Sequence, residues 1–304
     1  SLYNKHNQHP TNEGCTITYI MKDALGDRMK EFYEDRTRIK LPRRTYTIIR
    51  IDGKAFHTYT KGLERPFDLG FMEDMNKTTE YLCQNIQGAK FGYVQSDEIT
   101  ILITDYDDIS THAWFDGNLQ KMSSIASSLA TAKFNQLRMA RFARNSGIEP
   151  KFRDESYIAE SEIENFKLAM FDARVFQIPY HEEVFNYFIW RQQDASRNSI
   201  SSVAQANFST KELNGKKTSD MQDMLMLEKG INWNDFSPRE KRGALIRKVE
   251  RHFVRKDIEP IDDGKTYESI KELFELTHAK IINKSINICL KIYPIRIFRV
   301  YIFT

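Results

Sequence analysis

The stretch KFGYVQSDEITILITD, residues 90–105, decides the fold of this chain. Its β-branched, aromatic and other apolar residues predict two strands, and the polar residues Gln95 to Glu98 predict the turn at which they meet. Consecutive strands joined so closely usually pair side by side in one sheet. The segments before and after this pair are therefore expected to complete the same sheet or to pack against it.

Further from this pair, strands and helices follow one another in a definite order. TYTIIRID, residues 45–52, is β-branched and stops at an Asp-Gly turn, and FDARVFQIP, residues 171–179, predicts another strand. Apolar spacing or caps indicate helices at 67–86, 115–145 and 181–208. The order β-α-ββ-α-β predicts an α+β, ferredoxin-like fold, in which a four-stranded antiparallel sheet carries two helices on one face.

The remaining segments complete the expected domain organisation. Residues 21–35 predict a helix, and residues 211–258 predict a mostly helical C-terminal extension. The main domain is expected to span residues 21–210. A flexible or tag-like extension, 1–20, precedes it, and a peripheral tail, 259–304, follows the helical extension.

The composition is typical of a globular chain and excludes a polybasic nucleic-acid coat. Among 304 residues, 45 Lys and Arg stand against 42 Asp and Glu, which gives a formal net charge of +3. Residues 281–304 contain four bases and no acid, so the rest of the chain carries 41 bases and 42 acids. No apolar run is long enough to predict a membrane span or the core of a signal peptide.

Three cysteines, Cys15, Cys83 and Cys289, are scattered and form no CxxC pair. This argues against a disulfide framework and a cysteine zinc site, and it favours a cytoplasmic location. GxGxxG, GxxxxGK[ST] and HExxH are absent, so neither a Rossmann or P-loop phosphate site nor a metalloprotease helix is indicated.

Three acidic residues fall at strand ends. Asp52 closes the first strand, and Asp97 and Glu98 occupy the turn between the second and third. In the ferredoxin-like order the first and third strands are central neighbours, so Asp52 and Asp97 are expected at the same edge of the sheet. Two adjacent carboxylates repel each other unless a cation lies between them, and Mg²⁺ prefers carboxylate, phosphate and water oxygens. The alternative is structural, because Asp-Gly and Ser-Asp-Glu are also ordinary turn sequences.

Five stretches, in the right order, resemble the tRNA-histidine guanylyltransferase family, and the match is closest to its bacterial and archaeal "like" branch. They are RIDGKAFHTYTKG (50–62), YVQSDEITILI (93–103), FDARVFQIP (171–179), YFIWRQQDASRNS (187–199) and KGINWN (229–234). The resemblance runs from about residue 21 to about residue 250. It implies a polymerase-type palm that adds nucleotides in the 3′→5′ direction at the 5′ end of tRNA, after ATP has activated the 5′ phosphate.

The resemblance also implies roles for individual residues. Asp52, the backbone carbonyl of Gly53 and Asp97 are the implied ligands of two Mg²⁺ ions, and Glu98 follows as a further catalytic acid. Arg65 stands where relatives have a Lys that holds triphosphate, and its charged fork suits phosphate. The implied contacts to ATP and other NTPs are Asp52, Gly53, Lys54, Ala55, Phe56, His57, Arg65, Ser96, Asp97 and Lys121.

Three of these positions keep an alternative open. Phe56 either stacks on a base or packs in the core, and His57 either contacts triphosphate or is a satisfied loop histidine. Lys121 is one position away from the family's Lys, where this chain has Gln120. One residue turns a helix by about 100°, so the reach of Lys121 to phosphate depends on the fold.

One segment departs from the eukaryotic members, which carry HINNLYN after the WRQ-D stretch. The aligned residues here are 196–202, SRNSISS, and only the first Asn is kept, as Asn198. This favours template-dependent repair of 5′-truncated tRNA. The alternative is a dedicated guanylyltransferase that adds one G to histidine tRNA.

Basic residues at helical spacing indicate where tRNA would be held, although a solvated helix face is the ordinary alternative. The predicted tRNA contacts are Arg138, Arg141, Arg144, Asn198, Lys241, Arg242 and Lys248. Because a tRNA is larger than this chain and family members resemble tetramers, we expect a homo-tetramer built as a dimer of dimers.

Two other classes share this strand order. Nucleotide cyclases use the same carboxylate chemistry but lack the WRQ-D and KGINWN stretches. An RNA-binding module would display aromatic residues on an open face of the sheet.

Overall fold

The computed structural model describes residues 23–145, 166–250 and 256–261, with residues 248–250 and 256–261 described as backbone only. The chain divides into two units between Arg38 and Ile39. In the first unit, helix α1 (Ala24–Met29) continues into helical turns at Lys30–Glu34 and Asp35–Thr37. The helix expected at 21–35 is therefore present from residue 24 onward.

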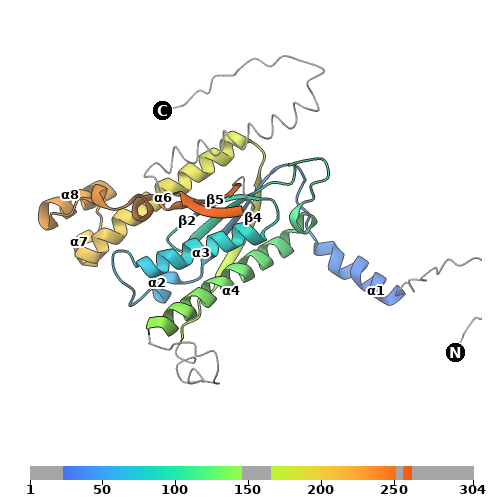
Figure 1. Ribbon diagram of the computed structural model, residues 1–304, viewed down its shortest axis with the longest axis horizontal. Coiled ribbons are helices and arrows are strands. Elements are labelled where there is room, and N and C mark those ends of the chain that lie inside the picture. The colour runs from blue at the N-terminus through green and yellow to red at the C-terminus, as the bar shows by residue number, and fades with distance from the viewer. Residues whose placement is uncertain (1–22, 146–165, 251–255, 262–304) are drawn as a thin grey trace, which may run out of the picture. The chain divides into compact units, whose positions relative to one another are not determined.

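One antiparallel sheet forms the centre of the second unit (Figure 1), with its strands in the order β4-β1-β3-β2-β5-β6. The strands are β1 (Tyr46–Gly53), β2 (Ala89–Gln95), β3 (Glu98–Ile103), β4 (Phe171–Ile178), β5 (Ala244–Glu250) and β6 (Lys256–Ile261). The first four match the predicted strands within one residue or two. Their order confirms the ferredoxin-like fold, with the first and third strands as neighbours.

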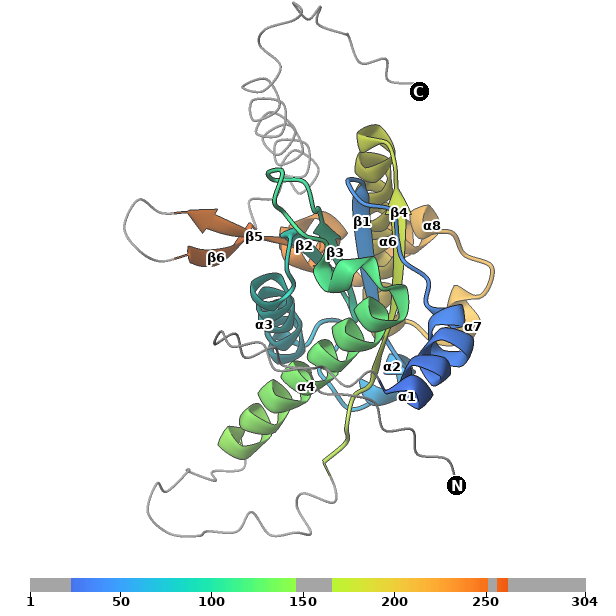
Figure 2. The same ribbon diagram turned by 90° about the vertical axis from the view of Figure 1, so that its right-hand side faces the viewer.

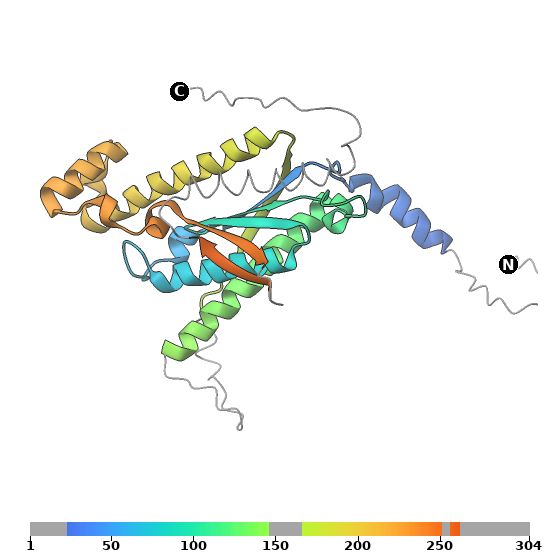
Figure 3. The ribbon, with the colours of Figure 1, turned by 45° about the horizontal axis from the view of Figure 1, so that its top comes forward.

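Helices cover the sheet on both sides. They are α2 (Phe56–Tyr59), α3 (Leu69–Asn85), α4 (Leu119–Asn145), α6 (His181–Asn207), α7 (Thr210–Leu213), α8 (Thr218–Lys229) and α9 (Pro238–Arg242). Single turns of 3₁₀ helix lie at Trp114–Gly117 and Trp233–Asp235. Figure 3 shows α3 and α4 on one side of the sheet and α6 on the other, and Figure 2 shows the same layers end-on.

Alternation along β1 explains both layers, because successive side chains of a strand point to opposite faces. Ile49 and Ile51 belong to the core under α3 and α4, whereas Ile48 packs against Val184 and Phe188 of α6. The two helices predicted on one face are α3 and α4, and α6 buries the opposite face. A sheet covered on both sides in this way does not offer the open aromatic face that the RNA-binding module requires.

The segment 211–258 differs from its prediction in its second half. Helices α7, α8 and α9 are present, but residues 244–250 form β5, which pairs with β2, and 256–261 form β6. The extension was predicted to be mostly helical, yet Ala244 and Leu245 are fully buried as strand residues. Gly243, with φ 80°, permits this pairing, since a Cβ there would lie 2.5 Å from the Val94 carbonyl oxygen.

Within the described residues, no helix is both long enough and apolar enough to cross a membrane. The expected extension at 1–20 and all but the first residues of the tail at 259–304 lie outside them.

Candidate active site

The predicted carboxylates meet at one end of the sheet. β1 and β3 pair so that Asp52 lies opposite Glu98, and the Gly53 N–H donates to the Asp97 carbonyl oxygen over 3.2 Å. Asp97 follows Ser96, whose φ of 47° makes the tight turn between β2 and β3. Asp52 and Asp97 therefore share one edge of the sheet, as their strand positions predicted.

Negative charge at Asp97 is poorly compensated by the protein. Burial is the largest influence and raises the pKa of its carboxyl group, and the nearby carboxylate of Asp52 raises that pKa further. Hydrogen bonds from its own backbone and from the Ser96 hydroxyl lower the pKa in part. A cation bound between the two aspartates would relieve their repulsion.

The donor set at this edge suits Mg²⁺. The Asp52 and Asp97 carboxylates and the Gly53 carbonyl are all oxygen donors, and all three residues line one pocket. In the part of the chain that the structure describes, no group of three or more His, Cys, Asp or Glu side chains is placed to hold a metal ion. A metal at this edge would therefore need donors of other kinds as well. Two carboxylates and a carbonyl leave positions for water and phosphate oxygens, which Mg²⁺ commonly retains. The residues fit the predicted ion.

Glu98 lies in a different environment from Asp97. Its side chain is only 4% exposed and accepts a hydrogen bond from Arg191 Nε over 2.8 Å. Arg50 Nη2 lies 2.7 Å from its other carboxylate oxygen and 3.8 Å from Asp52 Oδ2. Burial raises the pKa of Glu98, while Arg191 and Arg50 lower it. The predicted catalytic acid is thus the centre of a buried ion-pair network that reaches Asp52 through Arg50.

Gly53 is required by the turn that follows β1. A Cβ at this position would lie 2.3 Å from Phe56 Cδ2, so the ring and the backbone are in direct contact. Ala55, with φ 55°, begins helix α2, which turns Phe56 back over Gly53. Phe56 is 4% exposed, and its ring packs on those of Phe71, Phe134, Phe171 and Tyr59. The structure favours the core alternative for Phe56.

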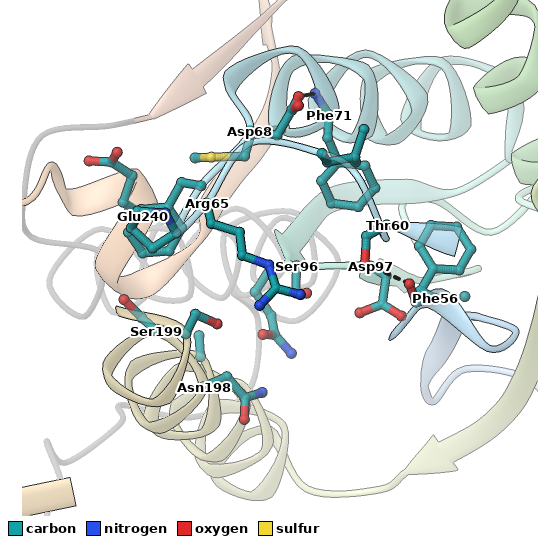
Figure 4. A pocket seen from close by; sticks show the side chains of 18 of the residues that line it. Phe56, Thr60, Arg65, Asp68, Phe71, Ser96, Asp97, Asn198, Ser199 and Glu240 are labelled. Carbon is teal, nitrogen blue, oxygen red and sulfur yellow. Dashed lines mark hydrogen bonds between the residues drawn. The ribbon is translucent and has the colours of Figure 1, made fainter. Parts of the chain in front are cut away.

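A cavity of about 630 Å³ opens in front of the acidic edge (Figure 4). His57 and Arg65 line it from the segment after β1, and Ser96 lines it from the turn before β3. Asn198, with Ser199 and Ser202, lines the opposite wall from α6. Arg65 makes no ion pair with any residue that the structure describes, and Figure 4 shows its side chain extending toward Ser96. The cavity therefore combines metal-type oxygen donors with an uncompensated guanidinium.

Other predicted nucleotide contacts lie beside this cavity or away from it. The Lys54 N–H donates to the Met170 carbonyl oxygen over 2.8 Å. The side chain of Lys54 is exposed and is not part of the pocket lining. His57, by contrast, lines the cavity, and its Nε2 lies 3.0 Å from Thr58 Oγ1 on the exposed surface of α2. Lys121 Nζ stacks 5.0 Å from the centre of the Phe115 ring and is not in the lining.

Three of the predicted tRNA contacts use their charged groups to bind partners within the protein. Arg138 and Arg141 form ion pairs with the buried Asp74, and the Lys241 ammonium donates to the Asn234 carbonyl oxygen over 2.6 Å. The Arg242 carbonyl accepts a hydrogen bond from the Tyr93 hydroxyl. Of the rest, Arg144 is exposed at the end of α4, Asn198 lines the pocket, and the side chain of Lys248 lies outside the description.

The structure adds two arginines that sequence reasoning did not assign. Arg50 lies within the apolar strand β1, and Arg191 is a 3% exposed residue of α6. A charged residue inside an apolar strand indicates a buried partner, and Arg50 in TYTIIRID is such a residue. The KGINWN stretch has a structural role. Its Trp233 indole N–H donates to Ser199 Oγ over 3.0 Å, and the Trp233 ring belongs to the hydrophobic cluster between α6 and the helical extension.

Comparison with known proteins agrees with these features. The family described as tRNAHis guanylyltransferase matches residues 26–179. A bacterial tRNA(His) guanylyltransferase-like protein in complex with ATP superimposes with a TM-score of 0.69, is 46% identical, and its match covers 83% of this chain and 99% of that chain. A bacterial protein of the same description in complex with GTP has a TM-score of 0.65, 44% identity and the same coverage.

A further relative is the tRNA(His) guanylyltransferase of Eremothecium gossypii, which is 27% identical over 217 residues, or 67% of this chain and 83% of the relative. The acidic edge, the cavity and the ordered motifs thus occur in a chain that is similar to these enzymes along most of its length. This protein belongs to the tRNAHis guanylyltransferase family and is a nucleotidyltransferase of that family.

Proposed function

We propose that this chain extends the 5′ end of tRNA in the 3′→5′ direction and repairs 5′-truncated tRNA by copying the opposite strand. One observation carries the proposal: Asp52 and Asp97 converge at the mouth of a cavity that also contains Arg65. Oxygen donors for a metal beside an uncompensated guanidinium are what a polyphosphate requires. The ATP and GTP complexes of the bacterial relatives support nucleotides as the substrates.

Two Mg²⁺ ions would be held by Asp52, Asp97 and the Gly53 carbonyl. When bound, they supply charge neutralisation for the triphosphate and lower the pKa of an attacking hydroxyl. The protein's own contribution is positioning. Gly53 keeps the carbonyl and both aspartates together through its hydrogen bond to Asp97, and the Phe56 ring prevents the turn from shifting. Arg65 binds phosphate oxygens through its paired N–H groups.

The reaction then needs two kinds of step on one site. The 5′ phosphate of a truncated tRNA first attacks the α-phosphate of ATP, which forms a 5′-adenylylated end and releases pyrophosphate. The 3′-hydroxyl of the incoming NTP next attacks the activated 5′ phosphate and displaces AMP. A tRNA with a 5′ triphosphate would skip the first step and release pyrophosphate. Such chemistry depends mainly on alignment and charge neutralisation, which the acidic edge and Arg65 support.

The α6 wall of the cavity supports repair over single-nucleotide addition. Asn198, Ser199 and Ser202 face the cavity with short neutral side chains in the segment where eukaryotic members carry HINNLYN. The α6 residues of the lining, which also include Ala195 and Gln205, carry no charge, and an uncharged wall sets few limits on which base pair it accepts. Addition of a single G to histidine tRNA is the alternative that the experiment has to separate.

The test offers 5′-truncated tRNAs with ATP, all four NTPs and Mg²⁺ to the wild type, to Asp97→Ala and to Asp108→Ala. Asp108 is an exposed acid beyond the other end of β3 and serves as the matched control. We expect extension that follows the template base when that base is changed, lost in Asp97→Ala and kept in Asp108→Ala. Addition of one G to full-length histidine tRNA only would support the alternative, and no incorporation at all would contradict both.

Assembly and location stay predictions from the sequence. We propose tRNA as the partner, and a tetramer as the form that holds both the acceptor end and the body of the tRNA. Light scattering with and without tRNA measures the assembly, and fractionation of cells measures the expected cytoplasmic location.

A further inference from the structure

Gln95, the last residue of β2, carries a buried amide beside the acidic edge. It is 5% exposed and lines the cavity, two residues before Asp97. In the part of the chain that the structure describes, no group forms a hydrogen bond with its side-chain amide. A buried amide without a hydrogen bond is unfavourable, so we expect its partner to come from the cavity that Gln95 lines.

The register of the sheet places Gln95 in one row with the acidic residues. Gln95 lies opposite Glu98 across the turn between β2 and β3, and Glu98 lies opposite Asp52 on β1. Residues that are directly opposite in an antiparallel pair share a face of the sheet. The row Asp52, Glu98 and Gln95 therefore crosses the end of the sheet on the face that α6 covers.

The polar neighbours of Gln95 on this face are satisfied within the protein. Glu98 is paired with two arginines, and the hydroxyl of Tyr93, two residues earlier on β2, donates to the Arg242 carbonyl oxygen. Gly243, which also lines the cavity, has no side chain to cover Gln95, and a Cβ there would lie only 3.0 Å from Gln95 Cβ. The amide of Gln95 is thus left to whatever enters the cavity.

The chemistry of an amide favours a sugar hydroxyl over a phosphate. An amide is neutral and offers one acceptor oxygen and two N–H donors, and a hydroxyl, which both donates and accepts, fits it in either orientation. Phosphate oxygens only accept, and Arg65 or a metal ion matches them better. In the proposed reaction the 3′-hydroxyl of the NTP has to lie beside Asp52 and Asp97, so the ribose is the part of the NTP within reach of Gln95.

We propose that Gln95 is a ribose-binding residue: its amide hydrogen-bonds a ribose hydroxyl of the NTP and holds the sugar beside Asp52 and Asp97. This inference rests on the proposed function, because it assumes that the sugar of a nucleoside triphosphate lies at the acidic edge. Ribose hydroxyls are common to all four NTPs. A contact to them suits an enzyme whose choice of base comes from the template and not from the protein.

The test compares the wild type with three variants of the full chain. Gln95→Met replaces the amide by an apolar side chain of similar length, and Gln95→Ala removes it without any risk of overpacking. Gln84→Met makes the first change at an exposed residue of α3 outside the cavity lining and serves as the matched control. Calorimetry with Mg²⁺ measures the affinities for ATP, 2′,3′-dideoxy-ATP and inorganic tripolyphosphate, and thermal unfolding measures stability.

We expect the wild type and Gln84→Met to bind ATP roughly three- to tenfold more tightly than dideoxy-ATP, which lacks the hydroxyls. Both Gln95 variants should lose this preference, because the amide and the hydroxyls contribute through the same hydrogen bond. Their affinity for tripolyphosphate should not change. The melting temperature of Gln95→Met should stay the same or rise, since a buried amide is replaced by an apolar group of similar size.

A preference for ATP that survives in both Gln95 variants, or that the wild type lacks, would overturn the inference. Equal losses of ATP and tripolyphosphate affinity would also overturn it, because they would place Gln95 among the groups that hold metal or phosphate. A clear fall in the melting temperature of Gln95→Met would show a structural role instead. None of these measurements needs tRNA, so a failure of the proposed extension reaction remains distinguishable from a failure of this inference.

Discussion

Asp97 and Glu98 are adjacent acids in one turn, yet they belong to two regions with opposite electrostatics. On the cavity side, Asp97 faces Asp52, and burial and repulsion raise the pKa of its carboxyl group. On the α6 side, Glu98 lies between Arg191 and Arg50, at 2.8 Å and 2.7 Å. Among the described residues, no cation forms an ion pair with Asp97, whereas Glu98 pairs with both Arg191 and Arg50. The acidic edge therefore suits the external ion that we propose, and the Glu98 network holds the sheet end in place.

The largest expected effect is on catalysis at the acidic edge. Asp97→Ala should lower 5′ extension of tRNA by at least roughly 10³-fold, because it removes one of the metal ligands that we propose. Its melting temperature should stay the same or rise, since a poorly compensated buried charge is removed. Single-turnover extension and thermal unfolding measure the two quantities. A clear loss of stability with activity kept would mean that Asp97 has a structural role.

Glu98 should respond in the opposite way. Glu98→Gln removes one of the two carboxylates that pair with the buried Arg191 and leaves Asp194 as the other, so the free energy of unfolding should fall by about 2 kcal/mol. Urea denaturation monitored by tryptophan fluorescence measures the change. Activity per folded molecule should fall less than in Asp97→Ala, and the Mg²⁺ concentration for half-maximal rate should not move. A large shift in that concentration would place Glu98 among the metal ligands.

Metal binding should distinguish the two regions directly. Mg²⁺ at ten times its Kd should stabilise the wild type by about 1.4 kcal/mol, because it binds the folded state only. Glu98→Gln should gain the same increment from its lower baseline, and Asp97→Ala should gain none. Thermal unfolding with Mg²⁺ or EDTA provides the measurement. Stabilisation of Asp97→Ala by Mg²⁺ would show that the ion binds elsewhere.

The smallest effect concerns an exposed carboxylate between cations. Lys77 and Arg141 lower the pKa of Glu73 from 4.5 to about 2, but its side chain is 51% exposed. Glu73→Gln should therefore cost only a few tenths of a kcal/mol at pH 7. Because the folded-state pKa is depressed, the wild type's advantage should persist above about pH 4.5 and vanish as the pH falls toward 2. An advantage that grows on acidification would reverse the sign and contradict this assignment.

Local patterns predicted the elements that make up the sheet and its helices. Runs of β-branched and other apolar residues that end at turns identified β1 to β4, and the expected strand order placed Asp52 beside Asp97. Patterns failed where two signals competed. Residues 211–258 were predicted to be mostly helical, but the apolar residues of ALIRKVE (244–250) follow the pleat of β5, and Ala244 and Leu245 are buried beside β2.

Side-chain roles were less predictable than backbone elements, because a charge does not reveal its partner. Arg138 and Arg141 have the spacing of an RNA-binding stripe, and only packing of α4 on α3 brings them to Asp74. Phe56 carried two interpretations until the turn at Ala55 directed its ring into the core.

The sequence by itself determined the order of strands and helices, the edge at which Asp52 and Asp97 meet, and the family. These follow from periodicity and short motifs, which are local along the chain. Only the tertiary structure decided that Glu98 is bound by two arginines, that α6 covers the second face, and that Arg138 and Arg141 pair with the buried Asp74. Pairing of charges across elements depends on which faces are buried together, and no local pattern contains that information.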